Sequence, residues 1–263
     1  MFNPSFLTRF TSIEITIVVI ILMIMFYWLG RFMIQKFIQL NPDQRDKNSG
    51  MVVGSLLGLL ALILSFTFGL SNGRYDKRMT VVVEEANIIG TAILRADLYP
   101  DSIRNLLRTE FKNYVETRIA YQEAGRNLPK IYEALDSANA SQQRLWKIVT
   151  TAAQDRDNLV RTSNMVPAMN QLIDIVTVRN AVAIAKVPDL VIFLLFILCF
   201  SASFLLGYLS PAKPEWGIVT CFLIMIGLAI YMILDLDRPR SGIINLKDMN
   251  YFITSLRSMF TTP

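Results

Sequence analysis

The charged side chains whose spacing could support chemistry gather beside long apolar segments. Asp235, Asp237 and Arg238 follow the last of these segments. Carboxylates placed two residues apart could supply oxygen ligands to a cation. Asp235 and Arg238 are three residues apart, so they could instead form a local ion pair on a helix. The segment is therefore either a cation site or an ion-paired membrane boundary, and the spacing favours the boundary.

A basic cluster, Arg74, Lys77 and Arg78, follows an earlier apolar segment. At the mouth of a pore, such a cluster would form an electropositive vestibule that concentrates anions. The same residues could instead set the membrane topology by lying at the lipid headgroups. Topology determinants of this kind are the more common case in membrane proteins.

Composition argues against an enzyme. The 263 residues include no histidine, which removes histidine acid-base catalysis and histidine metal ligation. Both cysteines, Cys199 and Cys221, lie in apolar segments, where we expect two buried free thiols; a disulfide would require the two helices to touch at that depth. The chain contains no phosphate-binding loop, serine-hydrolase motif or zinc-ligand spacing. We therefore expect no catalytic residues, no metal, no cofactor and no nucleic-acid partner.

Four apolar segments are long enough to cross a membrane as helices. The chain is 53% hydrophobic with a mean hydropathy of +0.41. We expect helices at about 13–38, 50–73, 189–210 and 216–236. The first ends in Phe26-Tyr27-Trp28 and then Arg31, which is typical of a retained membrane helix and not of a cleaved signal peptide. Trp216 is expected to anchor the fourth helix at the interface.

The second apolar segment contains many small residues. It carries no charge from Asn48 to Gly73, and its small residues are Gly54, Gly58, Ser65, Gly69, Ser71 and Gly73. Small residues allow another backbone to approach closely or leave room in a water-lined interior. We expect this helix to face the centre of an oligomer, with Gly58, Leu62, Phe66 and Gly69 on one face of the helix. A ring of Phe66 side chains could form a hydrophobic constriction, although helix packing is the alternative.

A helical insert separates the second and third membrane helices. Within it, Ile103, Leu107, Phe111 and Tyr114 recur at helical spacing. Ser163 is expected to cap the last insert helix, with Pro167 in the first turn. Glu85 could pair with Arg179 across two helices. The predicted organisation is an N-terminal hairpin (1–74), a helical domain (75–187), a C-terminal hairpin (188–240) and a tail (241–263).

Four membrane helices place both termini and the insert on one side. Nine Lys and Arg residues flank the membrane on that side: Arg9, Arg74, Lys77, Arg78, Arg179, Lys186, Arg238, Arg240 and Lys247. Five flank the other side: Arg31, Lys36, Arg45, Lys47 and Lys213. Because cytoplasmic flanks carry the excess of positive charge, we expect the termini and the insert in the cytoplasm.

Four stretches resemble a known family. The second helix and its exit read LSFTFGLSNGRYDKRMTVVVEEAN, which resembles the pore helix of bestrophins and its exit. Glu85-Ala86-Asn87, MNQLIDIVTVRNAVAIAKVPDL and DLDRPRSGII (235–244) are similar to segments of the bestrophin-like family of bacterial membrane proteins. The resemblance covers roughly residues 13–244.

The resemblance implies an all-α membrane fold with four transmembrane helices and a helical cytoplasmic insert between the second and third. It implies a homo-oligomer in the bacterial inner membrane, pentameric in bestrophins, around a pore lined by the second helix. The pore-lining residues would be Gly58, Leu62, Phe66 and Gly69. The resemblance implies conduction of small inorganic ions, which are anions in the animal proteins and cations in some bacterial relatives; we slightly favour anions here. The tryptophan pair and acidic residues that follow Tyr-Asp-Arg in bestrophins are replaced by Arg78-Met79-Thr80-Val81, so selectivity and gating do not transfer.

The alternative is a non-conducting membrane scaffold or sensor. The helical insert is larger than a pore requires, and it could bind a cytoplasmic protein partner. An open path along the oligomer axis would favour the channel, whereas a packed axis would favour the scaffold.

Overall fold

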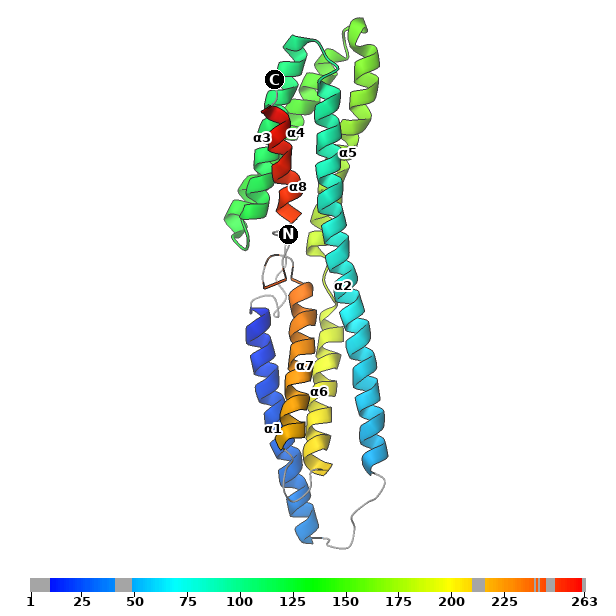
Figure 1. Ribbon diagram of the computed structural model, residues 1–263, viewed down its shortest axis with the longest axis vertical. Coiled ribbons are helices and arrows are strands. Elements are labelled where there is room, and N and C mark those ends of the chain that lie inside the picture. Colours follow the sequence, from blue (N-terminus) through cyan, green and yellow to red (C-terminus); the bar gives the residue numbers. More distant parts are fainter. Residues whose placement is uncertain are drawn as a thin grey trace. The chain divides into compact units, whose positions relative to one another are not determined.

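The computed structural model describes residues 10–40, 49–209, 216–238, 240, 242–244 and 249–261, and this part of the chain is helical with no strands. The helices in chain order are α1 (Ser12–Leu40), α2 (Ser49–Ala96), α3 (Asp101–Glu123), α4 (Leu128–Ala152), α5 (Leu159–Ile184), α6 (Asp189–Leu209), α7 (Trp216–Leu236) and α8 (Asn250–Thr254) (Figure 1). Two 3₁₀ helices, η2 (Arg156–Asn158) and η4 (Ser255–Phe260), accompany them.

The predicted all-helical fold with four apolar helices is confirmed. Four helical stretches of the described residues are long and apolar enough to span a membrane: Ser12–Lys36, Met51–Ala96, Arg156–Leu209 and Trp216–Leu236. The predicted loop at 41–48, the turn at 210–215 and residues 245–248 of the predicted tail lie outside the described residues, as do the flanking residues Arg9, Arg45, Lys47, Lys213 and Lys247.

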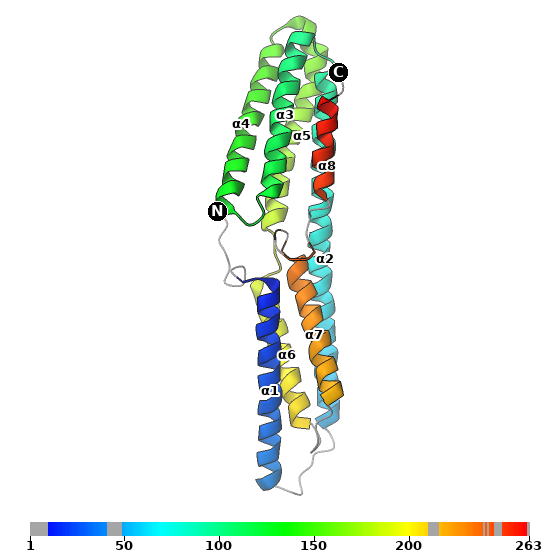
Figure 2. The ribbon, with the colours of Figure 1, turned by 60° about the vertical axis from the view of Figure 1, so that its left-hand side comes forward.

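The chain divides into two compact units, one formed by residues 1–74 and 186–238 and the other by residues 75–185 and 239–263. In the first unit, α1 lies beside α6 and α7 (Figure 2). Glycine makes the approach of α1 and α6 possible. A Cβ atom at Gly207 would lie 1.9 Å from the carbonyl oxygen of Tyr27, and one at Gly30 would lie 2.1 Å from that of Phe204. This contact has no room for a larger residue at either position.

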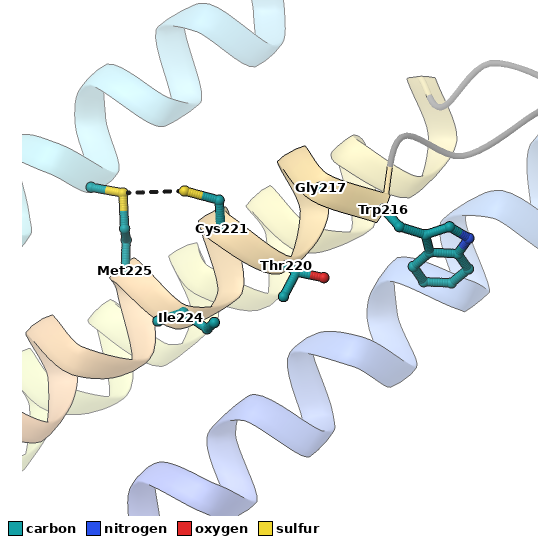
Figure 3. A pocket seen from close by; sticks show the side chains of 6 residues that line it. All are labelled: Trp216, Gly217, Thr220, Cys221, Ile224 and Met225. Carbon is teal, nitrogen blue, oxygen red and sulfur yellow. Dashed lines mark hydrogen bonds between the residues drawn. The ribbon is translucent and has the colours of Figure 1, made fainter.

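Aromatic side chains join the same helices. Phe26 stacks on Phe200 with ring centroids 5.3 Å apart. The ring of Trp216 lies 5.9 Å from that of Trp28, and Figure 3 shows Trp216 directed toward α1. In the same view, Cys221 and Met225 lie on another side of α7, with their sulfur atoms 3.9 Å apart. Both cysteines are free thiols, as expected, but only Cys199 is buried; Cys221 is exposed, contrary to the expectation that both are buried.

The second unit packs α3, α4, α5 and the second half of α2 around a main core, and Tyr121, Ala124, Ile131 and Ala134 form a smaller separate cluster. Phe111 and Tyr114 of the predicted α3 stripe are fully buried in it, together with Leu145 and Met169. The short α8 and η4 lie against α3. There, Arg257 donates two hydrogen bonds to the Glu116 carboxylate, at 2.8 and 2.6 Å.

Two helices differ from their predicted extents. The second membrane helix was expected to end at Gly73, but α2 continues without interruption to Ala96. Glycine costs a helix only about 1 kcal/mol relative to alanine, which helix-forming residues on both sides can offset. The expectation that Ser163 caps the last insert helix was wrong, because α5 begins at Leu159 and contains Pro167 in its interior. Buried Met165 lies beside the proline and holds that turn in the core.

Candidate functional site

Helix α2 has a narrow buried face in its first half. Val53, Leu60, Thr67 and Ser71 are buried at successive steps of 7, 7 and 4 residues, which places them on one side of the helix. Leu60 belongs to the same apolar cluster as residues of α6 and α7. One stripe of α2 therefore holds it against the other membrane helices.

The predicted pore-lining residues lie on the opposite face of α2. Gly58, Leu62, Phe66 and Gly69 are separated by 4, 4 and 3 residues and are all exposed, Phe66 to 63%. A Cβ atom added at Gly58 or Gly69 would meet nothing within 4 Å. The same holds at Gly54 and Gly73. These glycines differ from Gly30 and Gly207, where a neighbouring helix of the chain packs so closely that only glycine fits.

This exposed face continues along the second half of α2 and becomes polar. After Gly73, the exposed residues at the same helical spacing are Lys77, Thr80, Glu84, Asn87 and Thr91. In the second unit, Thr80, Glu84 and Asn87 line an open groove together with Met249 and Phe252. One face of a single helix thus changes from small and apolar residues to polar ones.

The structure separates the three residues of the basic cluster. Arg78 is buried, and its guanidinium donates to the carbonyl oxygens of Val182 at 3.2 Å and Ala185 at 2.6 Å. These carbonyls are at the C-terminal end of α5, where donors and positive charge are stabilising. Lys77 lies on the exposed face, and Arg74 is partly exposed. Only Lys77 therefore lies on the same face as Leu62 and Phe66.

The acidic segment at the C-terminal end of α7, from Asp235 to Arg238, contacts several parts of the first unit. Asp235 is fully buried. Both carboxylate oxygens of Asp237 accept from the backbone N–H of Val187, at 3.0 and 3.1 Å. The Arg238 guanidinium donates to the carbonyl oxygen of Phe10. Among the described residues, no group of three or more Asp, Glu, Cys or His side chains could hold a metal ion.

A buried ionic cluster in the second unit includes residues that the sequence analysis did not identify. The expected contact between Glu85 and Arg179 is present. Arg118, which is 0% exposed, adds a hydrogen bond from its Nε to Glu85 at 2.5 Å. Arg118 follows Tyr114 by four residues, so it extends the apolar stripe of α3. The position of Arg118 in this stripe could therefore have indicated from the sequence that its side chain is buried.

Both the sequence and the fold of this chain are similar to those of known proteins. A family model described as Bestrophin-like domain matches residues 19–251. The crystal structure of a bacterial Bestrophin homolog from Klebsiella pneumoniae, carrying a tryptophan-to-alanine mutation, aligns with a TM-score of 0.69. The alignment covers 95% of this chain and 97% of that chain at 11% sequence identity, so the likeness shows the fold alone. A comparison with curated proteins gives no match.

Proposed function

Because the chain belongs to the bestrophin-like family, we propose that it is an oligomeric ion channel whose pore is lined by the exposed face of α2. The observation that carries the proposal is the contrast among the glycines. The space where a side chain would lie at Gly30 and Gly207 is occupied by backbone atoms of a neighbouring helix. At Gly58 and Gly69, no atom of another helix among the described residues lies within 4 Å of that position. A face of small residues without an internal partner suits a helix that borders a pore or another subunit.

Phe66 is the residue we assign to the constriction. It is the largest side chain among the four predicted pore-lining residues and is 63% exposed. A ring of such side chains around a symmetry axis would form a narrow apolar passage that opens and closes to water. The polar residues beyond Gly73, among them Thr80 and Asn87, would line a wider, hydrated exit.

Lys77 supports a slight preference for anions. It is exposed on the same face of α2 as Phe66, whereas the Arg78 guanidinium is bound to the end of α5. A positive charge near a pore mouth raises the local concentration of anions. We further propose a pentamer in the bacterial inner membrane, with the termini and the helical second unit in the cytoplasm.

Single-channel recording in planar bilayers tests conduction. The purified oligomer should give unitary currents, and Phe66→Ala should enlarge the current or raise the open probability. Phe68→Ala is the matched control, because residues two apart on a helix point about 200° apart and Phe68 lies off this face. A folded oligomer that gives no current would refute the channel, and equal effects of the two variants would remove Phe66 from the constriction.

A membrane scaffold or sensor is the second candidate function. The groove beside α2 in the second unit is lined by apolar Met79, Val83, Met249 and Phe252 as well as by polar residues, and neighbouring Tyr251 is 70% exposed. Such a surface could receive a protein partner. The radius of the axial path in the purified oligomer discriminates the two: a path closed by packed side chains or lipid favours the scaffold.

A further inference from the structure

Three arginines converge on one tyrosine ring in the second unit. The guanidinium carbons of Arg118, Arg179 and Arg240 lie 4.8, 5.3 and 4.4 Å from the centre of the Tyr121 ring. They come from α3, from α5 and from the segment after α7. Arginines attract aromatic faces, but three on one ring place like charges close together. The arrangement therefore needs negative charge nearby.

Only one carboxylate is bound to these arginines among the described residues, and it is that of Glu85. One of its oxygens accepts from Arg118, and the other contacts Arg179. Arg240 donates instead to two neutral groups, the carbonyl oxygens of Tyr121 at 3.3 Å and Gly125 at 3.0 Å. Three positive charges and one negative charge leave an excess of two. Arg118 and Arg179 are buried whereas Arg240 is partly exposed, so one of the excess charges is buried, and an uncompensated buried charge is strongly unfavourable.

Several hydrogen-bond donors in the cluster have no acceptor among the residues that the structure describes. Arg118 is fully buried, yet neither of its Nη atoms has a hydrogen-bond partner among the described residues. The side-chain amide of Gln122, one turn further along α3, is also buried and unpartnered at both of its polar atoms. Buried polar groups are nearly always satisfied in folded proteins, so the donors among these atoms, the two Nη of Arg118 and the Nε2 of Gln122, point to an absent acceptor.

We propose that this cluster binds a small tetrahedral oxyanion of the phosphate or sulfate class. Planar guanidinium groups present paired N–H donors that match the oxygens of such an ion. The unpartnered Nη atoms of Arg118 and the charge of Arg240 would hold it, and Arg240, which is partly exposed, marks the side from which it enters. The bound ion would join α2, α3, α5 and the segment after α7.

This site is distinct from the proposed pore wall. Glu85 is fully buried, and as the next residue along the helix it points about 100° away from Glu84, off the exposed face that carries Glu84 and Asn87. The oxyanion is therefore a ligand of the helical unit and not a conducted ion. Its binding does not depend on whether the protein conducts.

Thermal unfolding of the full-length protein in detergent, titrated with sodium phosphate, tests the proposal. Sodium chloride at matched ionic strength controls for screening. Phosphate should raise the unfolding temperature with a saturable dependence that chloride does not reproduce. Arg240→Gln should weaken phosphate binding roughly 10- to 100-fold, the loss expected for a charged hydrogen-bond donor. Arg156→Gln, which changes an exposed arginine of the same unit, should leave the phosphate dependence unchanged.

Glu85→Gln provides a second variant with the opposite sign. Removing the single carboxylate lowers the stability without phosphate but raises the positive charge of the site, so phosphate should bind more tightly. A cluster that serves only to connect helices would show no such gain. Equal shifts from phosphate and chloride, or an unchanged phosphate dependence in Arg240→Gln, would overturn the proposal. If Glu85→Gln does not fold, the comparison of Arg240→Gln with Arg156→Gln still decides it.

Discussion

A methyl group at Gly207 should force α1 away from α6. The added Cβ would lie 1.9 Å from the carbonyl oxygen of Tyr27, whereas ordinary contact begins near 3.4 Å. The two helices would have to separate by 1.5 Å (3.4 − 1.9) at this point. Because the obstructing atom belongs to the backbone, no side chain can rotate to relieve the contact. Overpacking of this kind typically costs about 1–3 kcal/mol, and we expect Gly207→Ala to reach the upper part of that range.

Gly58→Ala is the matched control. A Cβ at Gly58 meets nothing within 4 Å, so the substitution adds no contact within the chain. Alanine is also favoured over glycine in a helix by about 1 kcal/mol. The free energies of unfolding of the two variants should therefore differ by about 2–4 kcal/mol, with Gly58→Ala equal to or above the wild type.

Unfolding by sodium dodecyl sulfate in mixed micelles measures this difference. Tryptophan fluorescence is a suitable probe, because Trp28 of α1 and Trp216 of α7 contact each other. Equal destabilisation by the two alanine substitutions would refute the reasoning, since it would mean that α1 and α6 do not meet at Gly207. Light scattering on the same samples reports whether Gly58→Ala changes the oligomer.

Three further predictions concern polar contacts. Hydrogen bonding to Arg257 lowers the pKa of Glu116. The pair therefore stabilises the packing of α8 and η4 against α3 fully at pH values above the ordinary glutamate pKa of about 4.3. This stabilisation is lost as the pH falls through the lowered pKa of Glu116. Hydrogen exchange of α8 and η4 should accelerate at that acidic pH, and Arg257→Gln should abolish the change. Asp237→Ala leaves the backbone N–H of Val187 without its acceptor and should lower the free energy of unfolding by about 1–3 kcal/mol, whereas Asp237→Asn, which keeps an acceptor oxygen, should lower it less. Arg78→Met removes two hydrogen bonds to the end of α5. Hydrogen exchange should become faster only in the last turn of α5. Equally faster exchange across the whole second unit would contradict a local role for Arg78.

Hydropathy and helical periodicity in the sequence were enough to predict the apolar helices and the faces of several helices. Hydropathy identifies the four apolar helices because a membrane span is defined by a contiguous run of residues. Helical periodicity likewise identifies the buried stripe of α3, including Phe111 and Tyr114. The spacing of Gly58, Leu62, Phe66 and Gly69 was enough to place them on one face of a helix, and the structure shows that face exposed.

Helix continuity could not be determined in the same way. Gly69, Gly73 and the basic residues after them have the composition of a membrane exit, and composition does not distinguish a helix that ends there from one that continues. The helix continues because residues of its second half, such as Ile89 and Ile93, are fully buried in the core of the second unit. That contribution comes from other helices and is not encoded locally.

Only the tertiary structure determines which charged side chains are exposed and which are buried against other groups. Lys77 and Arg78 are neighbours in one basic cluster, yet one is exposed and the other is bound to the end of α5. Arg118 and Arg240 are far apart in the sequence and meet at one tyrosine ring. The free energy of a charge depends on the groups around it in space, so its role follows from the fold and not from its neighbours in the chain.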